Sequence, residues 1–507
     1  MNLLQSTRAF PLAVLVAAVL LRFGLVAGGG QYFHFDEARH ERAIWIYTSL
    51  WRGDTAPLRA VAAMPEHGLF PWVGVGVTAV QHLVAQATAH GDWSRPENVA
   101  ATTGIGAAVL SLFSALNLLL AWRLARVLGA THPEANAALL LMAVSNTAFY
   151  HARFLLPYDC AIAAVLVALL LVATRPTLGR TVAGGVVLGF AYHLYNGYWY
   201  VVPLAWGALV GIGRGQTPLR NRAIVGGVGV AAGGILPVAV GVAAGGDEFL
   251  AAMRDFSRSA TQGAFAEGWS LPWEYAWHSE GMMGLLLAGV LIWAGGDAWR
   301  ERRRMPGWGW GSLAVLAGGY ALLVLFSVGL ERIVVYARTL KPMVVPACLL
   351  GGWALARVVE KSGRLGPAVV AAVALGGALR LAPHFAQTFP REVEAAVTRQ
   401  FGIPKRTLSV TGAIYLPSRR PVTRPDLLLV DAQNLFPIAG RRPVPAGRTL
   451  LRVEHPLAYL PLQYEGYSPR ERALLRSADL SIRLLQLERP AEVPDDLPAS
   501  ERYQPSR

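Results

Sequence analysis

The chain has few cysteines and few charged residues for its length. Only two of its 507 residues are cysteine, and Asp, Glu, Lys and Arg together make up 15%. Cys160 and Cys348 each lie in an apolar segment, which argues against a disulfide scaffold and excludes paired zinc-type cysteine spacing. Soluble domains carry about 25% charged residues. The low charge therefore argues against an ordinary soluble protein.

What the chain has instead is long apolar sequence. Apolar residues make up 54%, and the mean hydropathy is +0.38. Eleven runs approach the roughly 20 residues that a membrane-spanning helix needs. They are 10–29, 99–121, 135–152, 159–174, 181–197, 198–213, 223–244, 281–295, 311–328, 342–356 and 366–381. The first run is longer than the apolar core of a typical signal peptide, so we expect it to stay as a helix.

The net charge of +14 indicates topology rather than nucleic-acid binding, because the basic residues lie mostly between the apolar runs. A further apolar stretch, 69–89, contains Gln81, His82 and Gln86. Whether it crosses the membrane decides on which side all later connections lie. If it does not cross and the amino terminus is cytoplasmic, every cytoplasmic connection is basic. We therefore predict that 69–89 is an interfacial helix on the outer leaflet.

Two domains follow from this organisation. Residues 1–381 form an all-α polytopic membrane domain with about 11 transmembrane helices and juxtamembrane helices in the first external loop. Residues 382–507 are richer in Arg, Pro and Glu and form a small external α/β or mostly β domain with a disordered end. Its strand-like runs are RTLSVTGAIYL, DLLLVDAQNLF, TLLRVEHPL and LSIRLLQLE.

The predicted topology gathers unusual polar residues on the outer face. The stretch QYFHFDEARHERAIW directly follows the first apolar run and contains the acidic pair Asp36 and Glu37. Charged groups at membrane depth are costly and usually face a protein interior or a wet cavity. We therefore expect a cavity at the outer ends of the helices. The other residues that converge there are Arg153, Tyr158, Asp159, Tyr195, Tyr336, Arg338 and Lys341.

A carboxylate beside several arginines suits a reaction with an anionic leaving group. Arg and Lys bind phosphate through charge-assisted hydrogen bonds, and a carboxylate accepts a proton from an attacking hydroxyl. Glycoside hydrolysis needs a second carboxyl to protonate a poor leaving group, whereas a lipid phosphate leaves readily. One base with cationic stabilisation therefore suffices for glycosyl transfer.

Four segments, in order, resemble a known family. They are FDEARHERAIW, PEHGLFPW, LLLMAVSNTAFYHARFLLPYD and YARTLKPMVVPA. They are similar to motifs of GT-C glycosyltransferases, in the branch that contains protein O-mannosyltransferases and lipid A aminoarabinose transferases. The likeness covers roughly residues 8–360. The chain has Gly68 and Leu69 where that branch has Pro-Pro, and Pro157 lengthens the interval from Arg153 to Asp159.

The resemblance implies a polyprenyl-phosphate sugar as donor and a hydroxyl acceptor on a lipid, glycan or protein. Transfer would invert the sugar carbon on the periplasmic side of a bacterial inner membrane. Asp36 matches the catalytic base and Asp159 the second acid, and Glu37 is a further catalytic candidate. The expected contacts to the donor phosphate are His67, Arg338, Lys341 and Arg153, and those in the substrate groove are Tyr195 and Tyr336.

Other interpretations of the same residues stay open. Asp36 and Glu37 also suit the first turn of an interfacial helix, where acids are favourable. Adjacent helical residues point about 100° apart, so only one of the two can face a site. The aromatic residues at 195–200 are also typical of a membrane-interface belt. No metal-ligand spacing is recognisable, so no cofactor is expected, although the resemblance leaves divalent-metal use open.

Two rival functions come from other classes. A polar-lipid transporter or flippase would place charges at mid-depth and often shows internal repeats, and no repeat is visible here. A non-catalytic scaffold in envelope assembly would retain a degenerate site, as the changes around His67 and Asp159 allow.

Overall fold

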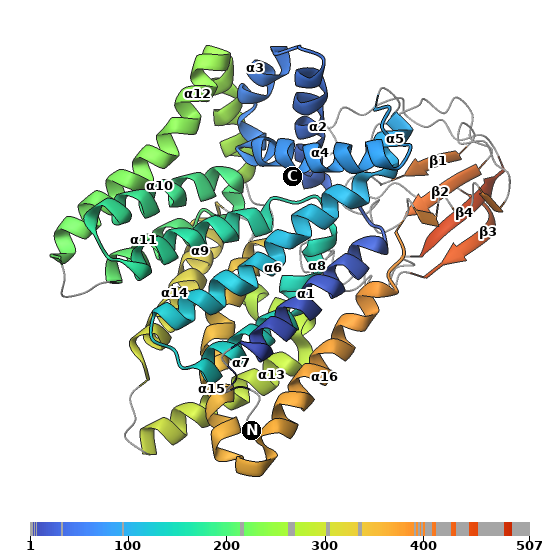
Figure 1. The fold of residues 1–507 in the computed structure, drawn as a ribbon. Coiled ribbons are helices and arrows are strands. Elements are labelled where there is room, and N and C mark those ends of the chain that lie inside the picture. The colour runs from blue at the N-terminus through green and yellow to red at the C-terminus, as the bar shows by residue number, and fades with distance from the viewer. Residues whose placement is uncertain are drawn as a thin grey trace.

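The protein is a helical bundle with a small β-sheet beside one end (Figure 1). This computed structural model describes residues 4, 6, 8–31, 34–93, 96–212, 217–261, 269–300, 305–332, 337–389, 392, 393, 396, 399, 400, 408–411, 427–431, 446–454 and 481–488.

Within the described residues, each of the eleven apolar runs lies mostly in helical structure, and the third is divided between two helices. These helices are α1 (Ala9–Ala27), α6 (Thr103–Val127), α7 (His132–Ala143) with α8 (Asn146–Tyr150), α9 (Tyr158–Thr174), α10 (Leu178–Leu194), α11 (Val201–Gly211), α12 (Leu219–Thr261), α13 (Leu271–Arg300), α14 (Gly307–Val324), α15 (Val344–Lys361) and α16 (Gly366–Phe385). The first loop holds α2 (Ala38–Trp51), α3 (Ala56–Ala62), α4 (Phe70–Ala87) and α5 (Pro96–Ala101).

Six helical stretches in the described part of the chain are long and apolar enough to cross a membrane. They are Ala9–Ala27, Thr103–Val127, Leu219–Arg258, Gly307–Gly329, Arg338–Lys361 and Gly363–Phe385. The chain is therefore a helical, multi-pass membrane protein. The predicted count of eleven crossings is not confirmed. The 17 residues of α9 extend about 25 Å, less than the roughly 30 Å of a hydrocarbon core, and α11 has only 11 residues.

Helix α4 covers most of the ambiguous stretch 69–89 and lies across the end of the bundle that also carries α2 and α3 (Figure 1). Two of its polar residues, Gln81 and His82, are buried against neighbouring segments, whereas Gln86 is exposed. Gln81 donates a hydrogen bond to the hydroxyl of Thr102 at 3.1 Å. The hydroxyl of Tyr47 lies 3.2 Å from Nδ1 of His82. These contacts account for Gln81 and His82 in an otherwise apolar helix. The interfacial position of this helix stays a prediction.

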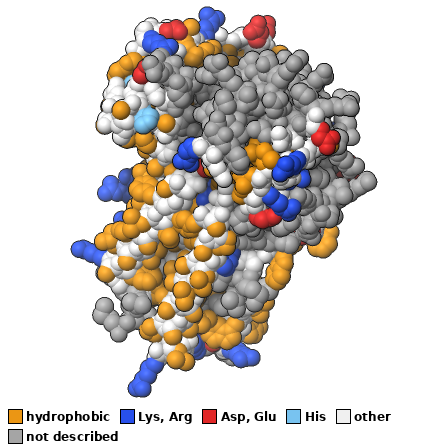
Figure 2. Space-filling view, turned by 90° about the vertical axis from the view of Figure 1, so that its right-hand side faces the viewer, with side chains coloured by type: hydrophobic (Ala, Val, Ile, Leu, Met, Phe, Trp, Pro, Cys, Tyr) orange, Lys and Arg blue, Asp and Glu red, His pale blue; other side chains and the backbone are white. Residues whose placement is uncertain are grey.

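Hydrophobic side chains cover much of the helical part on the face seen in Figure 2, with Lys and Arg side chains along its lower rim. Leu20 of α1 and Leu379 of α16 are strongly exposed leucines. At the end of the bundle where α13 and α15 finish, Asp297 pairs with Arg357 at 2.5 Å and with Lys361 at 3.5 Å. Two of the basic connections therefore lie at one end, as the positive-inside pattern requires.

The C-terminal region contains a four-stranded sheet in the order β1–β2–β4–β3. Strands β1 and β2 pair in parallel, and β4 pairs antiparallel with both β2 and β3. The strands are β1 (Leu408–Thr411), β2 (Leu427–Asp431), β3 (Gly447–Val453) and β4 (Ile482–Leu487). Each overlaps one of the four strand-like runs of the sequence. The end predicted to be disordered lies outside the described residues.

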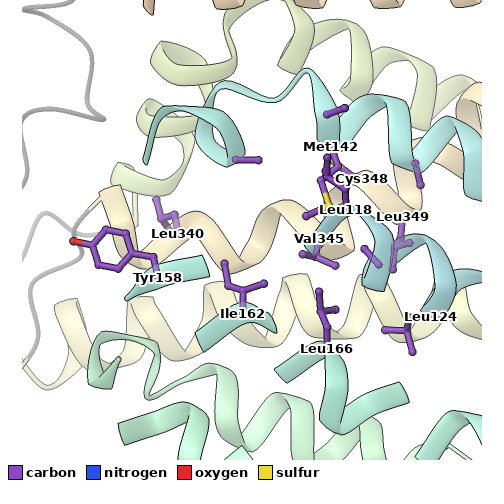
Figure 3. Packing of buried hydrophobic residues seen from close by; sticks show 14 of the residues in the cluster. Leu118, Leu124, Met142, Tyr158, Ile162, Leu166, Leu340, Val345, Cys348 and Leu349 are labelled. Carbon is purple, nitrogen blue, oxygen red and sulfur yellow. The ribbon is translucent and has the colours of Figure 1, made fainter. Parts of the chain in front are cut away.

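The largest buried hydrophobic cluster joins α6, α7, α9 and α15 (Figure 3). Tyr158 and Leu340 lie at one end of this cluster, and the hydroxyl of Tyr158 points away from it (Figure 3). Leu340 belongs to the 3₁₀ helix η7 (Ala337–Met343), which leads into α15. The core therefore brings the start of α9 against η7, although the two are far apart in sequence.

The two ends of the bundle should be accessible from opposite sides of the membrane. Arg52, after α2, and Leu365, between α15 and α16, are exposed and lie at opposite ends (Figure 1). Because Cys160 and Cys348 are buried, single Arg52→Cys and Leu365→Cys variants can be labelled selectively with an impermeant maleimide. We expect labelling of residue 52 from outside and of residue 365 from inside. Labelling of both from one side would contradict this orientation.

Candidate active site

The acidic pair follows α1 after a glycine turn. Gly29 and Gly30 have φ values of +83° and +97°, which favour glycine. The Gly30 N–H donates a hydrogen bond of 3.0 Å to Glu392, and the ring of Phe389 occupies the space that a side chain at position 30 would need. The turn is therefore packed under the start of the C-terminal region. Sequence analysis had given these glycines no role.

Asp36 is buried, with 8% of its surface exposed, in the 3₁₀ helix η2 (Phe35–Glu37). Its Oδ2 accepts a hydrogen bond of 2.7 Å from the hydroxyl of Tyr158 and lies 3.1 Å from Nη1 of Arg338. Its Oδ1 lies 3.8 Å from Nη2 of Arg39. The carboxylate therefore faces the protein interior, against groups from α9 and η7.

Two opposing effects act on the pKa of Asp36. Burial raises it by penalising the carboxylate. The charges of Arg338 and Arg39 and the Tyr158 hydrogen bond lower it, and together they outweigh burial and bring the pKa from 3.8 to about 2. Asp36 is therefore ionised at neutral pH and depends on its cationic neighbours.

A second ion pair lies beside the first. Asp159, at the start of α9, accepts a hydrogen bond of 2.7 Å from Nζ of Lys341, and Asn117 of α6 donates to its Oδ1 at 3.2 Å. Arg338 and Lys341 are three residues apart in η7. Because a 3₁₀ helix has three residues per turn, both project from the same side. Each therefore meets one acid, Arg338 meeting Asp36 and Lys341 meeting Asp159.

Aromatic rings hold this arrangement on one side. The ring of Tyr195 lies 4.6 Å from that of Tyr158, and the guanidinium of Arg39 lies over Tyr195 at 5.5 Å. Tyr198 is buried beside both tyrosines. Tyr195 is therefore part of the wall of the site. The interpretation of these buried tyrosines as a membrane-interface belt is wrong, because they face the core.

His67 lies near the same carboxylate, in the short 3₁₀ helix Pro65–His67. Its Nε2 accepts a hydrogen bond of 3.3 Å from Arg42. Burial lowers the pKa of His67 to about 3, with further lowering by Arg42 and Arg39. The ring is therefore neutral at neutral pH, and its 3.6 Å contact with Glu66 is no ion pair. His67 can serve as a polar contact but not as a cation.

Gly68 fixes His67 against α10. Gly68 has a φ of +59°, and a Cβ there would collide with the carbonyl oxygen of His193. That same oxygen accepts a hydrogen bond of 2.7 Å from the N–H of Leu69. Glycine at 68 is thus required by both backbone conformation and space.

Two other predicted site residues, Glu37 and Arg153, bind backbone groups of neighbouring segments. Glu37 is fully buried and accepts hydrogen bonds from the N–H groups of Leu155 at 2.8 Å and His34 at 2.9 Å. Arg153 donates to the carbonyl of His384 at 2.6 Å and lies over the ring of Phe389 at 4.8 Å. Glu37 thus ties the acidic turn to the loop before α9, and Arg153 faces the C-terminal junction. Tyr336 lies outside the described residues.

A carboxylate network holds the start of α8. Glu280 of α13 accepts hydrogen bonds from the hydroxyls of Ser145 and Thr147 at 2.7 and 2.8 Å. Arg380 of α16 pairs with it at 3.1 Å. Spacing along the chain gives no signal for this cluster, because its members come from three distant helices.

The ion pairs of the site join two carboxylates to three cations, whereas the buried Glu37 is bound by backbone N–H groups. Asp36 and Asp159 face three cations, Arg39, Arg338 and Lys341. An added anion would therefore find an attractive potential. Among the described residues there is no group of three or more His, Cys, Asp or Glu side chains placed to hold a metal ion.

Comparisons with known proteins identify no family. No model of a known protein family matches the chain, and no curated protein matches it.

The Gly68→Ala substitution should destabilise the protein. The strained backbone alone costs roughly 1–3 kcal/mol, and the contact with the His193 carbonyl adds to it. Gly53→Ala is the matched control, because Gly53 has a φ of +77° but nothing within 4 Å of its Cβ position. We expect a lower Tm in detergent for Gly68→Ala than for Gly53→Ala. Equal Tm values would contradict the close approach of α10.

The stability of the protein should depend on ionised Asp36. A carboxyl whose pKa falls from 3.8 to about 2 on folding contributes about 2 kcal/mol at pH 5. This contribution is lost as the pH falls from about 4 to 2, and Asp36→Asn lacks it throughout. We expect the Tm difference between wild type and Asp36→Asn to narrow between pH 5 and pH 2.5. A constant difference would contradict the ion pairing of Asp36.

Proposed function

We propose that the chain is a GT-C type glycosyltransferase. It transfers a sugar from a polyprenyl-phosphate donor to a hydroxyl acceptor, on the external face of a bacterial inner membrane. The observation that carries the proposal is the buried carboxylate of Asp36, 3.1 Å from Arg338 and beside the Asp159–Lys341 pair. A base next to excess positive charge, in a helical membrane protein, suits a lipid phosphate as leaving group.

The reaction is a single displacement at the anomeric carbon. The acceptor oxygen forms the new bond to that carbon as its proton passes to the carboxylate of Asp36. The bond between the anomeric carbon and the phosphate oxygen breaks, and its electron pair leaves with the polyprenyl phosphate. Attack opposite the leaving group inverts the carbon. Charge from Arg338 and Lys341 stabilises the departing phosphate.

The remaining residues take supporting roles in this proposal. Asp159 orients Lys341 through their 2.7 Å hydrogen bond. Neutral His67 offers a polar contact to the donor, and Tyr195 forms part of the wall against which the substrate lies. Glu37 and Arg153 act as positioning residues, because their contacts join the acidic turn and the Leu155 loop to the rest of the fold.

The test is transfer from a panel of polyprenyl-phosphate sugars by the purified protein in nanodiscs. Release of polyprenyl phosphate, through transfer or slow hydrolysis, is measured by mass spectrometry. We expect at least one donor to react and Asp36→Asn to slow release by roughly 10²–10⁴-fold, because the base is lost. Asp54→Asn is the control, since it removes an exposed carboxylate of the same external loop.

Two outcomes would contradict the proposal. One is that no donor binds or reacts. The other is that Asp36→Asn releases polyprenyl phosphate as fast as Asp54→Asn. The second result would favour a scaffold, and donor movement across the nanodisc without chemistry would favour a transporter.

A further inference from the structure

The carboxylate of Asp36 is engaged by side chains of the protein itself. Oδ2 accepts a hydrogen bond of 2.7 Å from the Tyr158 hydroxyl and forms an ion pair with Arg338 at 3.1 Å. Oδ1 lies 3.8 Å from Arg39. Each carboxylate oxygen offers two lone-pair sites, so both sites of Oδ2 are taken. An oxygen bound in this way is a poor base, consistent with the low pKa of Asp36.

The partners of Asp36 differ in how firmly they are held. Tyr158 is almost fully buried, and its ring packs against Tyr195 and Tyr198. Arg338 has a side chain that is 16% exposed, against 2% for Lys341 on the same face of η7. Lys341 is also held by Asp159 at 2.7 Å. Arg39 has a side chain that is 10% exposed and lies over the ring of Tyr195. Arg338 is therefore the most exposed of the three partners of Asp36 and the one best placed to change its contact.

A phosphate is the natural competitor for Arg338. The planar guanidinium binds phosphate and carboxylate with the same donor geometry. A phosphate held by Lys341 would lie within reach of Arg338, because the two side chains project together from η7.

We infer that Arg338 is exchanged from Asp36 to the donor phosphate when the donor binds. This inference rests on the proposed function, and it adds that donor binding controls when Asp36 can act as a base. Asp36 keeps its Tyr158 hydrogen bond, loses its closest cation, and only then becomes an effective base. The acceptor hydroxyl is thus activated only in the donor-loaded site, which imposes an order of donor before acceptor.

Direct binding of farnesyl monophosphate, a short polyprenyl phosphate, tests the exchange without any need for an acceptor. Affinity is measured by titration calorimetry on wild type, Asp36→Asn, Arg338→Gln and the double variant. If Asp36 competes for Arg338, Asp36→Asn should bind roughly tenfold tighter than wild type. That gain in affinity should vanish when the double variant is compared with Arg338→Gln alone. If Arg338→Gln alone folds poorly, the double variant is compared with wild type, and we expect it to bind farnesyl monophosphate no more tightly than wild type.

Farnesol and Asp54→Asn are the controls. Farnesol lacks the phosphate and should show no gain with Asp36→Asn, and Asp54→Asn should bind farnesyl monophosphate like wild type. The exchange is overturned if Asp36→Asn gives no gain, the same gain without Arg338, or the same gain with farnesol. Failure of wild type to bind farnesyl monophosphate at all would instead overturn the proposed donor class.

Discussion

Two buried carboxylates must be matched by cations, and the rest of the structure follows from that requirement. An unpaired buried charge costs several kcal/mol even after relaxation. Asp36 comes from the turn after α1 and Asp159 from the start of α9, while both of their closest cations come from η7. These three segments therefore have to meet. The helix that continues η7, α15, is correspondingly buried along most of its length and packs against α7.

The scaffolding around the ion pairs explains why they hold their geometry. Tyr158 is anchored in the hydrophobic core (Figure 3), and its hydroxyl donates a hydrogen bond to Asp36. Glu37 holds the loop before α9 through the N–H of Leu155. Gly29 and Gly30 allow Phe389 and Glu392 to pack on the turn. The C-terminal region is thus tied to the acidic segment, and it bears on the site through this junction.

Sequence patterns predicted the elements better than their placement. Long apolar runs located the helices, because burial in lipid or core demands an unbroken apolar stretch. Strand-like runs in the C-terminal region located the four strands. The apolar runs did not give the number of membrane crossings, because an apolar helix such as α11 has only 11 residues. Apolarity does not tell a lipid-facing helix from one buried among its neighbours.

The site shows the same division. Position in the predicted topology brought Asp36, Asp159, Arg338 and Lys341 to one face, and the structure pairs them as described. The predicted topology placed Arg153 with these four residues, but its side chain turns toward His384 instead. The direction of a side chain depends on packing, which the topology does not specify. The partner of Asp36 on α9, Tyr158, and the Glu280 network depend on contacts between segments more than a hundred residues apart. No local pattern encodes such contacts.

The most direct measurement is an experimental structure of the protein in nanodiscs with bound polyprenyl phosphate. We expect the phosphate within hydrogen-bonding distance of Arg338 and Lys341, and the distance from Arg338 to Asp36 lengthened beyond its present 3.1 Å. A phosphate bound away from η7, with the pair of Asp36 and Arg338 intact, would contradict the account.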